Sequence, residues 1–147
     1  MRRVPKRSVD AAASSAPVAP SRRRLPTTRE GVTRKFEIHG GEGGDSRVYD
    51  VYVNVGLYDD GTPGEVFIKV GKVGSELSGV YDALSLVMSM ALQHGVPLLT
   101  LLGKLRGMRF EPSGPTGDTE IGIVGSIPDA VAKWMLARFC VVEGGTP

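Results

Sequence analysis

The first hydrophobic pattern along the chain is an alternation of apolar and other side chains with a period of two. The segment VTRKFEIHG (32–40) is predicted to be a strand, and two clear alternating runs follow it. Their inward positions are Val51, Val53, Val55 and Leu57 in one run, and Val66, Ile68 and Val70 in the other. Such alternation is typical of strands with one buried face. The sequence therefore predicts a small sheet before residue 71.

Residues 59–64 separate the two runs and are rich in turn-forming residue types, which predicts a β-hairpin. The turn candidates are Asp59, Asp60, Gly61, Thr62 and Gly64. Two adjacent carboxylates can also form a catalytic pair, but their place in a short Gly/Pro-containing turn favours a structural role.

After residue 74 the spacing of apolar residues becomes helical. One stripe consists of Leu77, Val80, Tyr81, Leu84, Met88, Ala91 and Leu92, and a second consists of Ala83, Leu86, Val87 and Met90. A helix that is apolar on two sides must be covered on two sides. The second stripe therefore predicts contact with the remaining helices or with another subunit, and a homo-oligomer, most simply a two-fold dimer, is expected.

Two shorter helices are predicted downstream, over residues 98–105 and from Ser126 onward. Ser126 is a suitable N-cap, and Asp129 would lie near the positive end of the helix dipole. The inner stripe of the last helix is Ile127, Val131, Trp134, Met135 and Phe139. The predicted fold is α+β, with an antiparallel sheet of about three strands packed on a long central helix and two further helices.

Charge divides the chain unevenly. Residues 1–24 hold seven of the 18 Lys and Arg residues and one of the 16 acidic residues, and they lack apolar periodicity. A disordered basic arm is predicted at 1–24, followed by a domain at 25–141 and a flexible tail at 142–147. Nucleic-acid contact is expected, if at all, through the arm. No apolar run reaches the length of a membrane span, and a cytoplasmic location is expected.

Cysteine and histidine are scarce, which bears on the chemistry the chain can support. Cys140 is the one cysteine among 147 residues, and His39 and His94 lie far apart in the sequence. A zinc ribbon and a dithiol redox pair both need more cysteines. Neither a metal site nor a catalytic residue is predicted.

The segment RFEPSGPTGD (109–118) is the main candidate for a binding site, within an irregular connector at 108–126. Long irregular loops are often functional. The ligand-binding candidates are Arg109, Glu111, Ser113, Gly114 and Thr116. Two alternatives remain open: Arg109 and Glu111 clamp the loop to the body of the fold, or Ser113 and nearby amides bind an anion. The clamp is the favoured interpretation.

Four segments resemble a known family: RRRLPTTREGVTRKFEIHG, VGLYDDGTPGEVFIKV, ALQHGVPL and RFEPSGPTGD. They are similar to the C-terminal region of adenosylcobalamin-dependent (class II) ribonucleotide reductases, the TSCPD domain family, over roughly residues 22–140. The cysteine motif behind the family's name and the cysteine-rich tail of many full enzymes do not occur in this sequence. The loop between the first two strands is longer than expected for the family.

The resemblance implies that radical chemistry and adenosylcobalamin belong to a catalytic barrel upstream of this region in full enzymes. Such chemistry needs at least three cysteines, so the chain is not expected to be catalytic alone or to bind a cofactor. The expected function is a stand-alone accessory domain that supports ribonucleotide reduction, through a separate catalytic subunit or a nucleotide. The alternatives are a nucleotide-binding or nucleotide-sequestering protein, for example one encoded by a phage, and a purely structural oligomer.

Overall fold

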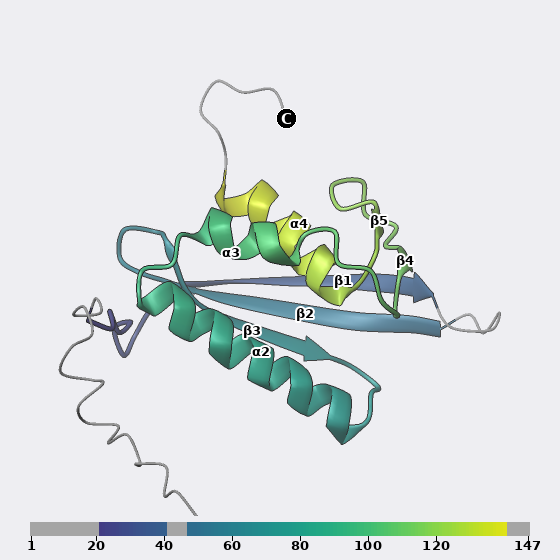
Figure 1. Cartoon of the computed structure of the whole chain (residues 1–147), viewed down its shortest axis with the longest axis horizontal. Helices are drawn as coiled ribbons and strands as arrows, with labels where there is room; N and C mark the ends of the chain where they lie inside the picture. The colour runs from purple at the N-terminus through teal and green to yellow at the C-terminus, as the bar shows by residue number, and fades with distance from the viewer. Residues whose placement is uncertain (1–20, 41–46, 141–147) are drawn as a thin grey trace, which may run out of the picture.

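The computed structural model describes residues 21–40 and 47–140, and these form an α+β domain (Figure 1). Strands β1 (Gly31–Gly40), β2 (Arg47–Leu57) and β3 (Pro63–Val70) make an antiparallel sheet in the order β1-β2-β3. The helices are α2 (Ser75–Gln93), α3 (Leu98–Leu105) and α4 (Ile127–Phe139). A two-residue ladder of β4 (Gly114–Pro115) and β5 (Ile123–Val124) lies between α3 and α4. The predicted fold class is confirmed, and the connector predicted as irregular contains this short ladder.

The core lies on one face of the sheet, as the alternation predicts. Val51, Val53 and Val55 of β2 are fully buried, and they join one apolar cluster with residues from β1, β3 and α4. The contributions of α4 are Ile127, Ala130, Val131, Ala132, Trp134 and Met135. On the opposite face of the sheet Tyr52 and Phe67 remain 42% and 44% exposed. One face of the sheet is thus covered by helices and the other is open.

The N-terminal boundary of the packed domain lies earlier than residue 25. Most of the predicted basic arm and the whole predicted tail 142–147 fall outside the described residues. Within the described part, the Arg22 Nε donates a hydrogen bond to Gln93 Oε1 at 2.7 Å. The Arg23 guanidinium stacks 3.9 Å from the centre of the Tyr58 ring, whose hydroxyl donates to the Arg23 carbonyl. These two arginines therefore belong to the packed domain.

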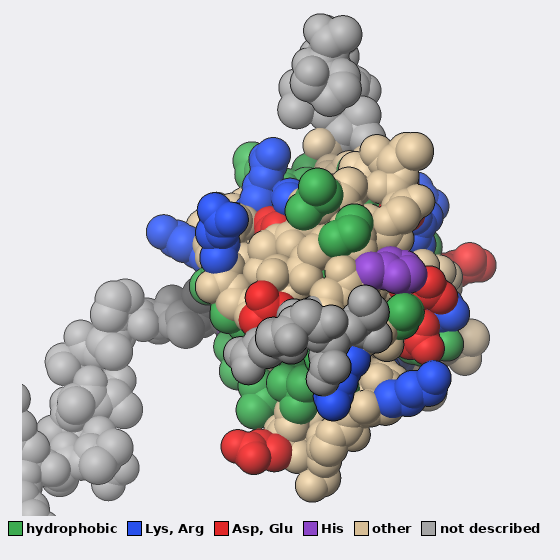
Figure 2. Space-filling model, turned by 90° about the vertical axis from the view of Figure 1, so that its right-hand side faces the viewer, with side chains coloured by type: hydrophobic (Ala, Val, Ile, Leu, Met, Phe, Trp, Pro, Cys, Tyr) green, Lys and Arg blue, Asp and Glu red, His purple; other side chains and the backbone are tan. Residues whose placement is uncertain are grey.

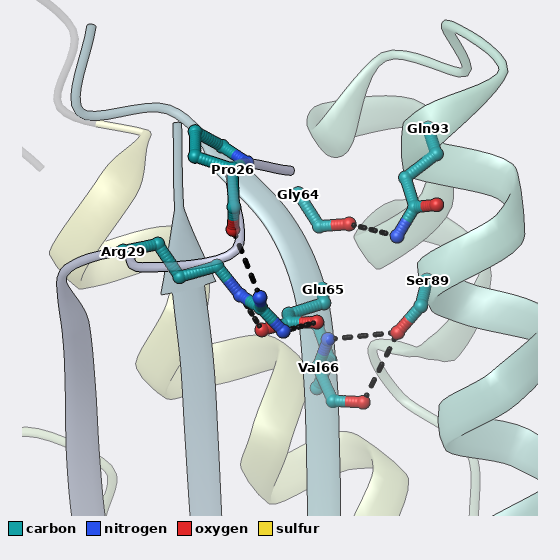
Figure 3. A network of polar contacts seen from close by, with 7 residues as sticks. All are labelled: Pro26, Arg29, Gly64, Glu65, Val66, Ser89 and Gln93. Atoms are coloured by element: carbon teal, nitrogen blue, oxygen red, sulfur yellow. Dashed lines mark hydrogen bonds and ion pairs between the residues drawn. The ribbon is translucent and has the colours of Figure 1, made fainter. Parts of the chain in front are cut away.

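Helix α2 lies along the outer edge of β3 and occupies its free backbone groups with polar side chains (Figures 1 and 3). The Val66 N–H donates to Ser89 Oγ at 2.9 Å, and the Ile68 N–H donates to Ser85 Oγ at 2.9 Å. One turn further along, Gln93 Nε2 donates to the Gly64 carbonyl at 3.0 Å. Side chains four residues apart share one face of a helix. This spacing lets a single polar stripe satisfy the edge strand.

Replacing Ser89 with alanine is expected to lower the free energy of unfolding by about 1–3 kcal/mol, because a buried backbone N–H would lose its acceptor. Ser89 is 9% exposed and also donates to the Val66 carbonyl at 3.2 Å. Urea unfolding provides the measurement. Ser78→Ala on the same helix is the matched control, since the Ser78 side chain has no hydrogen bond among the described residues. Equal stability of the two variants would contradict the prediction.

The second apolar stripe of α2 is not covered by the described part of the chain. Leu86 and Val87 are 64% and 62% exposed, and Ala83 is also exposed. Val80, which the spacing assigns to the inner stripe, is 57% exposed instead. It faces outward because α2 lies beside the edge of β3, where the polar stripe occupies part of the inward face.

None of the described helices combines the length and apolar character needed to span a bilayer.

Candidate functional site

A hollow of about 670 Å³ lies between the segment that follows α3 and the start of α4. One wall is formed by residues 107–114, and the other by β5 and the first turns of α4. Its volume falls in the range of small-molecule sites. The lining residues are Gly107, Arg109, Phe110, Glu111, Ser113, Gly114, Ile123, Val124, Gly125, Asp129 and Lys133.

Four of the five predicted ligand-binding candidates line this hollow: Arg109, Glu111, Ser113 and Gly114. Thr116 does not. Its hydroxyl donates to the Gly122 carbonyl at 2.6 Å and accepts from the Asp118 N–H at 3.2 Å, and the residue is buried. Thr116 therefore stabilises the turn between β4 and β5, whereas the other four share one site.

Asp129 is the main structural anchor of the hollow. It is 2% exposed, and its carboxylate accepts from the Gly107 N–H at 2.7 Å and the Gly125 N–H at 2.9 Å. Lys133, four residues later, lies 3.0 Å from the same carboxylate. Burial alone would raise the pKa of Asp129, but the two backbone donors and the Lys133 ammonium outweigh it and hold the pKa below its ordinary value. The carboxylate joins both walls of the hollow.

The local sequence explains how Asp129 reaches this position. Ser126 caps α4 by accepting the Asp129 N–H at 3.1 Å, which confirms the predicted helix start. The capping geometry places Asp129 in the first turn, beside the positive end of the helix dipole. The dipole contact was predicted from sequence, whereas the bonds to Gly107 and Gly125 were not.

Glu111 and Arg109 do not pair with each other. The Glu111 carboxylate accepts from the Ser113 N–H at 3.1 Å and the Ser113 hydroxyl at 3.0 Å, within its own turn. Arg109 is exposed and has no ion pair or side-chain hydrogen bond among the described residues. Other contacts hold the loop: the Phe110 N–H donates to the Gly125 carbonyl at 3.0 Å, and Arg34 of β1 pairs with Asp118. The predicted Arg109–Glu111 clamp is thus replaced by Asp129 and by the Arg34–Asp118 pair.

The turn candidates lie at the opposite end of the sheet from β4 and β5 (Figure 1). Asp60 accepts from the Thr62 hydroxyl at 2.6 Å and the Thr62 N–H at 3.0 Å, and these bonds lower its pKa. Gly61 has a φ of 83°, which favours glycine. At Gly64 a Cβ would lie 2.6 Å from the Tyr58 ring. Asp59 is exposed. These residues shape the β2–β3 turn.

Lys133 and Phe110 line the hollow but were not among the predicted candidates. Lys133 carries the i, i+4 signal of an ion pair with Asp129, which could have identified it from sequence. Phe110 has no comparable sequence signal.

Within residues 21–40 and 47–140, no group of three His, Cys, Asp or Glu side chains is placed to hold a metal ion. Burial raises the pKa of the Cys140 thiol.

Comparison with known proteins gives a consistent result. The family model described as the TSCPD domain matches residues 19–138. A vitamin B12-dependent ribonucleotide reductase of Rhodopirellula baltica is 44% identical over 120 residues, which cover 82% of this chain and 11% of that protein. A reductase of the same name from Streptomyces clavuligerus is 40% identical over 124 residues, 84% of this chain and 12% of that protein. The chain thus spans about a tenth of the length of these relatives. No solved structure matches it.

Proposed function

Because the chain belongs to the TSCPD domain family, we propose that it supports ribonucleotide reduction as a non-catalytic domain that acts beside a separate catalytic chain. The observation that carries this proposal is 44% identity to a segment that forms only 11% of a vitamin B12-dependent reductase. A domain this similar to a small part of a large enzyme is suited to perform that part's task.

The chemistry of the described residues supports a non-catalytic role. The two carboxylates that line the hollow, Asp129 and Glu111, are already engaged by hydrogen-bond donors of the fold. The sequence contains one cysteine, Cys140, and burial raises the pKa of its thiol, which disfavours the reactive thiolate. Adenosylcobalamin and the radical chemistry would belong to the catalytic chain.

Reconstitution tests this proposal. The Rhodopirellula baltica reductase without its matching segment is mixed with this chain and adenosylcobalamin, and deoxyribonucleotide formation is measured. We expect the chain to raise the rate of the truncated enzyme and to form no product alone. The chain unfolded by heat before mixing is the control. A rate that stays unchanged when the chain is in large excess would contradict the proposal.

A second candidate function is nucleotide binding without turnover. The observation that favours it is the hollow, which joins an exposed arginine, Arg109, with a half-exposed aromatic ring, Phe110. Such a domain would hold a nucleotide for a reductase or sequester it. Equilibrium dialysis against a mixture of nucleoside triphosphates tests this function independently of any reductase.

We also propose that the chain forms a homo-oligomer through the second apolar stripe of α2. Leaving such side chains exposed is unfavourable, since burial of one Leu or Val stabilises by roughly 1.5–3 kcal/mol. Light scattering should therefore give at least a dimer mass for the native chain. Leu86→Lys should shift the protein toward a monomer, whereas Thr100→Lys on the exposed side of α3 should not. A monomer mass for the native chain at micromolar concentrations would contradict this proposal.

A further inference from the structure

We infer that the hollow binds a nucleoside phosphate, with the phosphate on Arg109 and the base against Phe110, an assignment that rests on the second candidate function. The two groups are adjacent in the chain and both line the hollow. Such a ligand carries negative charge at one end and a flat aromatic surface at the other, and the lining of the hollow offers a match for both.

Both carboxylates that line the hollow are already engaged by donors of the fold. Asp129 is held by two backbone N–H groups and by Lys133. Glu111 is held by the N–H and hydroxyl of Ser113. A carboxylate that accepts several hydrogen bonds repels an incoming anion less than a free one does. Among the charged side chains that line the hollow, Arg109 is the one without a partner in the described part of the chain, so it is the group available to an anion.

Positive charge is in surplus beside the hollow. Arg29, just before β1, is ion-paired to Glu65, and Lys35 and Lys69 in the sheet are ion-paired to Asp50 and Asp82. By contrast, Lys104, Arg106 and Arg109 have no ion pair within the described part of the chain, although they lie within six residues of one another. The end of the molecule that carries β4 and β5 shows Lys and Arg side chains gathered at the upper left, with hydrophobic side chains among them (Figure 2).

Arg109 has the donors that a phosphate needs. A guanidinium carries five N–H donors in a planar fork, and none of those of Arg109 is used by another described residue. Lys133 donates to Asp129 and to the Ile123 carbonyl at 3.0 Å, which leaves one of its three donors for a ligand. Gly125 permits this arrangement, because a Cβ there would lie 2.8 Å from the Met108 carbonyl oxygen and 3.2 Å from Arg109 Cγ.

The apolar part of the lining suits a base. Phe110 is 48% exposed and Ile123 is 73% exposed, and both line the hollow. Aromatic side chains bind bases of any sequence by stacking, because every base has a π-face. Both exposed side chains would lose contact with water when a base is bound.

Isothermal titration calorimetry with ATP, ADP, adenosine and inorganic triphosphate tests the assignment. We expect ATP and ADP to bind more tightly than adenosine or triphosphate. Arg109→Gln should weaken ATP binding by about tenfold or more, as expected for loss of a charged contact. Phe110→Leu should weaken ATP binding by about fivefold or more and leave triphosphate binding unchanged. Arg138→Gln, at the far end of α4, is the matched control and should bind like the native chain.

The possible results distinguish a wrong assignment of the site from a failure of the second candidate function, nucleotide binding. If the native chain binds none of the four compounds, the second candidate function fails together with the site. If it binds ATP and both hollow variants bind ATP equally well, the site is wrong while nucleotide binding stands. If triphosphate binds as tightly as ATP and Phe110→Leu has no effect, the base contact is wrong. Melting temperatures confirm that each variant is folded.

Discussion

Replacing Glu65 with alanine is expected to lower the free energy of unfolding by roughly 3 kcal/mol, because it leaves the Arg29 guanidinium without its counter-ion in a half-buried position. Glu65 is 9% exposed, and its carboxylate receives two hydrogen bonds from Arg29, from Nε and from Nη2 (Figure 3). Arg29 also donates to the Pro26 carbonyl at 3.0 Å. The pair therefore fastens the segment before β1 to the opposite edge strand.

Chemical denaturation of three variants measures this coupling. Arg29→Ala and Glu65→Ala should each destabilise, and the double variant should lose clearly less than the sum of the two. Gly56→Ala should also destabilise, because the added Cβ would overlap the Glu65 side chain across the β2–β3 ladder. Lys69→Ala breaks an exposed ion pair with Asp82 and should change stability by less than about 1 kcal/mol. An equally small effect of Glu65→Ala would show that the Arg29 pair does not stabilise the fold.

Asp129→Asn is expected to cost about 2–3 kcal/mol at neutral pH, since one of two backbone donors loses its acceptor and Lys133 loses its counter-ion. The hollow should lose its shape as well, because Asp129 bonds to both of its walls. Thermal unfolding of the variant beside Asp59→Asn, an exposed turn residue, provides the measurement. The control, Asp59→Asn, should have the same melting temperature as the native protein.

The stabilisation by Asp129 should depend on pH in a defined direction. Its pKa is lowered in the folded state, so the unfolded chain takes up a proton at a higher pH than the folded chain does. The stabilisation is therefore fully present above the ordinary Asp pKa of about 3.9 and is lost as the pH falls through the lower folded value. The difference in melting temperature between native protein and Asp129→Asn should shrink below about pH 4. A difference that does not change with pH would contradict this account.

Sequence periodicity predicted the elements well but not the position of α2. The alternating runs correctly predicted which face of the sheet is buried, and Ser126 correctly predicted where α4 begins. Ser85, Ser89 and Gln93 are buried polar residues, and periodicity methods treat such residues as gaps in an apolar stripe. Their partners are backbone groups of β3, which carry no sequence signal. The exposure of Val80 follows from the same contact.

Only part of the candidate site was predicted, because only part of it comes from residues that are close together in the sequence. Arg109, Glu111, Ser113 and Gly114 come from one short segment, so sequence proximity alone brings them together. Asp129 and Lys133 reach the hollow from α4: their i, i+4 spacing indicates that they pair with each other, but no local pattern encodes the contact of Asp129 with Gly107. The Arg29–Glu65 pair, 36 residues apart, was missed for the same reason.

The polar stripe of α2 also limits how copies of this domain can aggregate. An edge strand with free backbone groups is a template for adding further strands, and a sheet with two such edges can grow into a fibre. Here the backbone groups of Val66 and Ile68 on the outer edge of β3 are occupied by Ser89 and Ser85. At the other edge of the described sheet, β4 packs against the end of β1 near His39 and Gly40. Addition of further strands is therefore disfavoured at both edges of the described sheet.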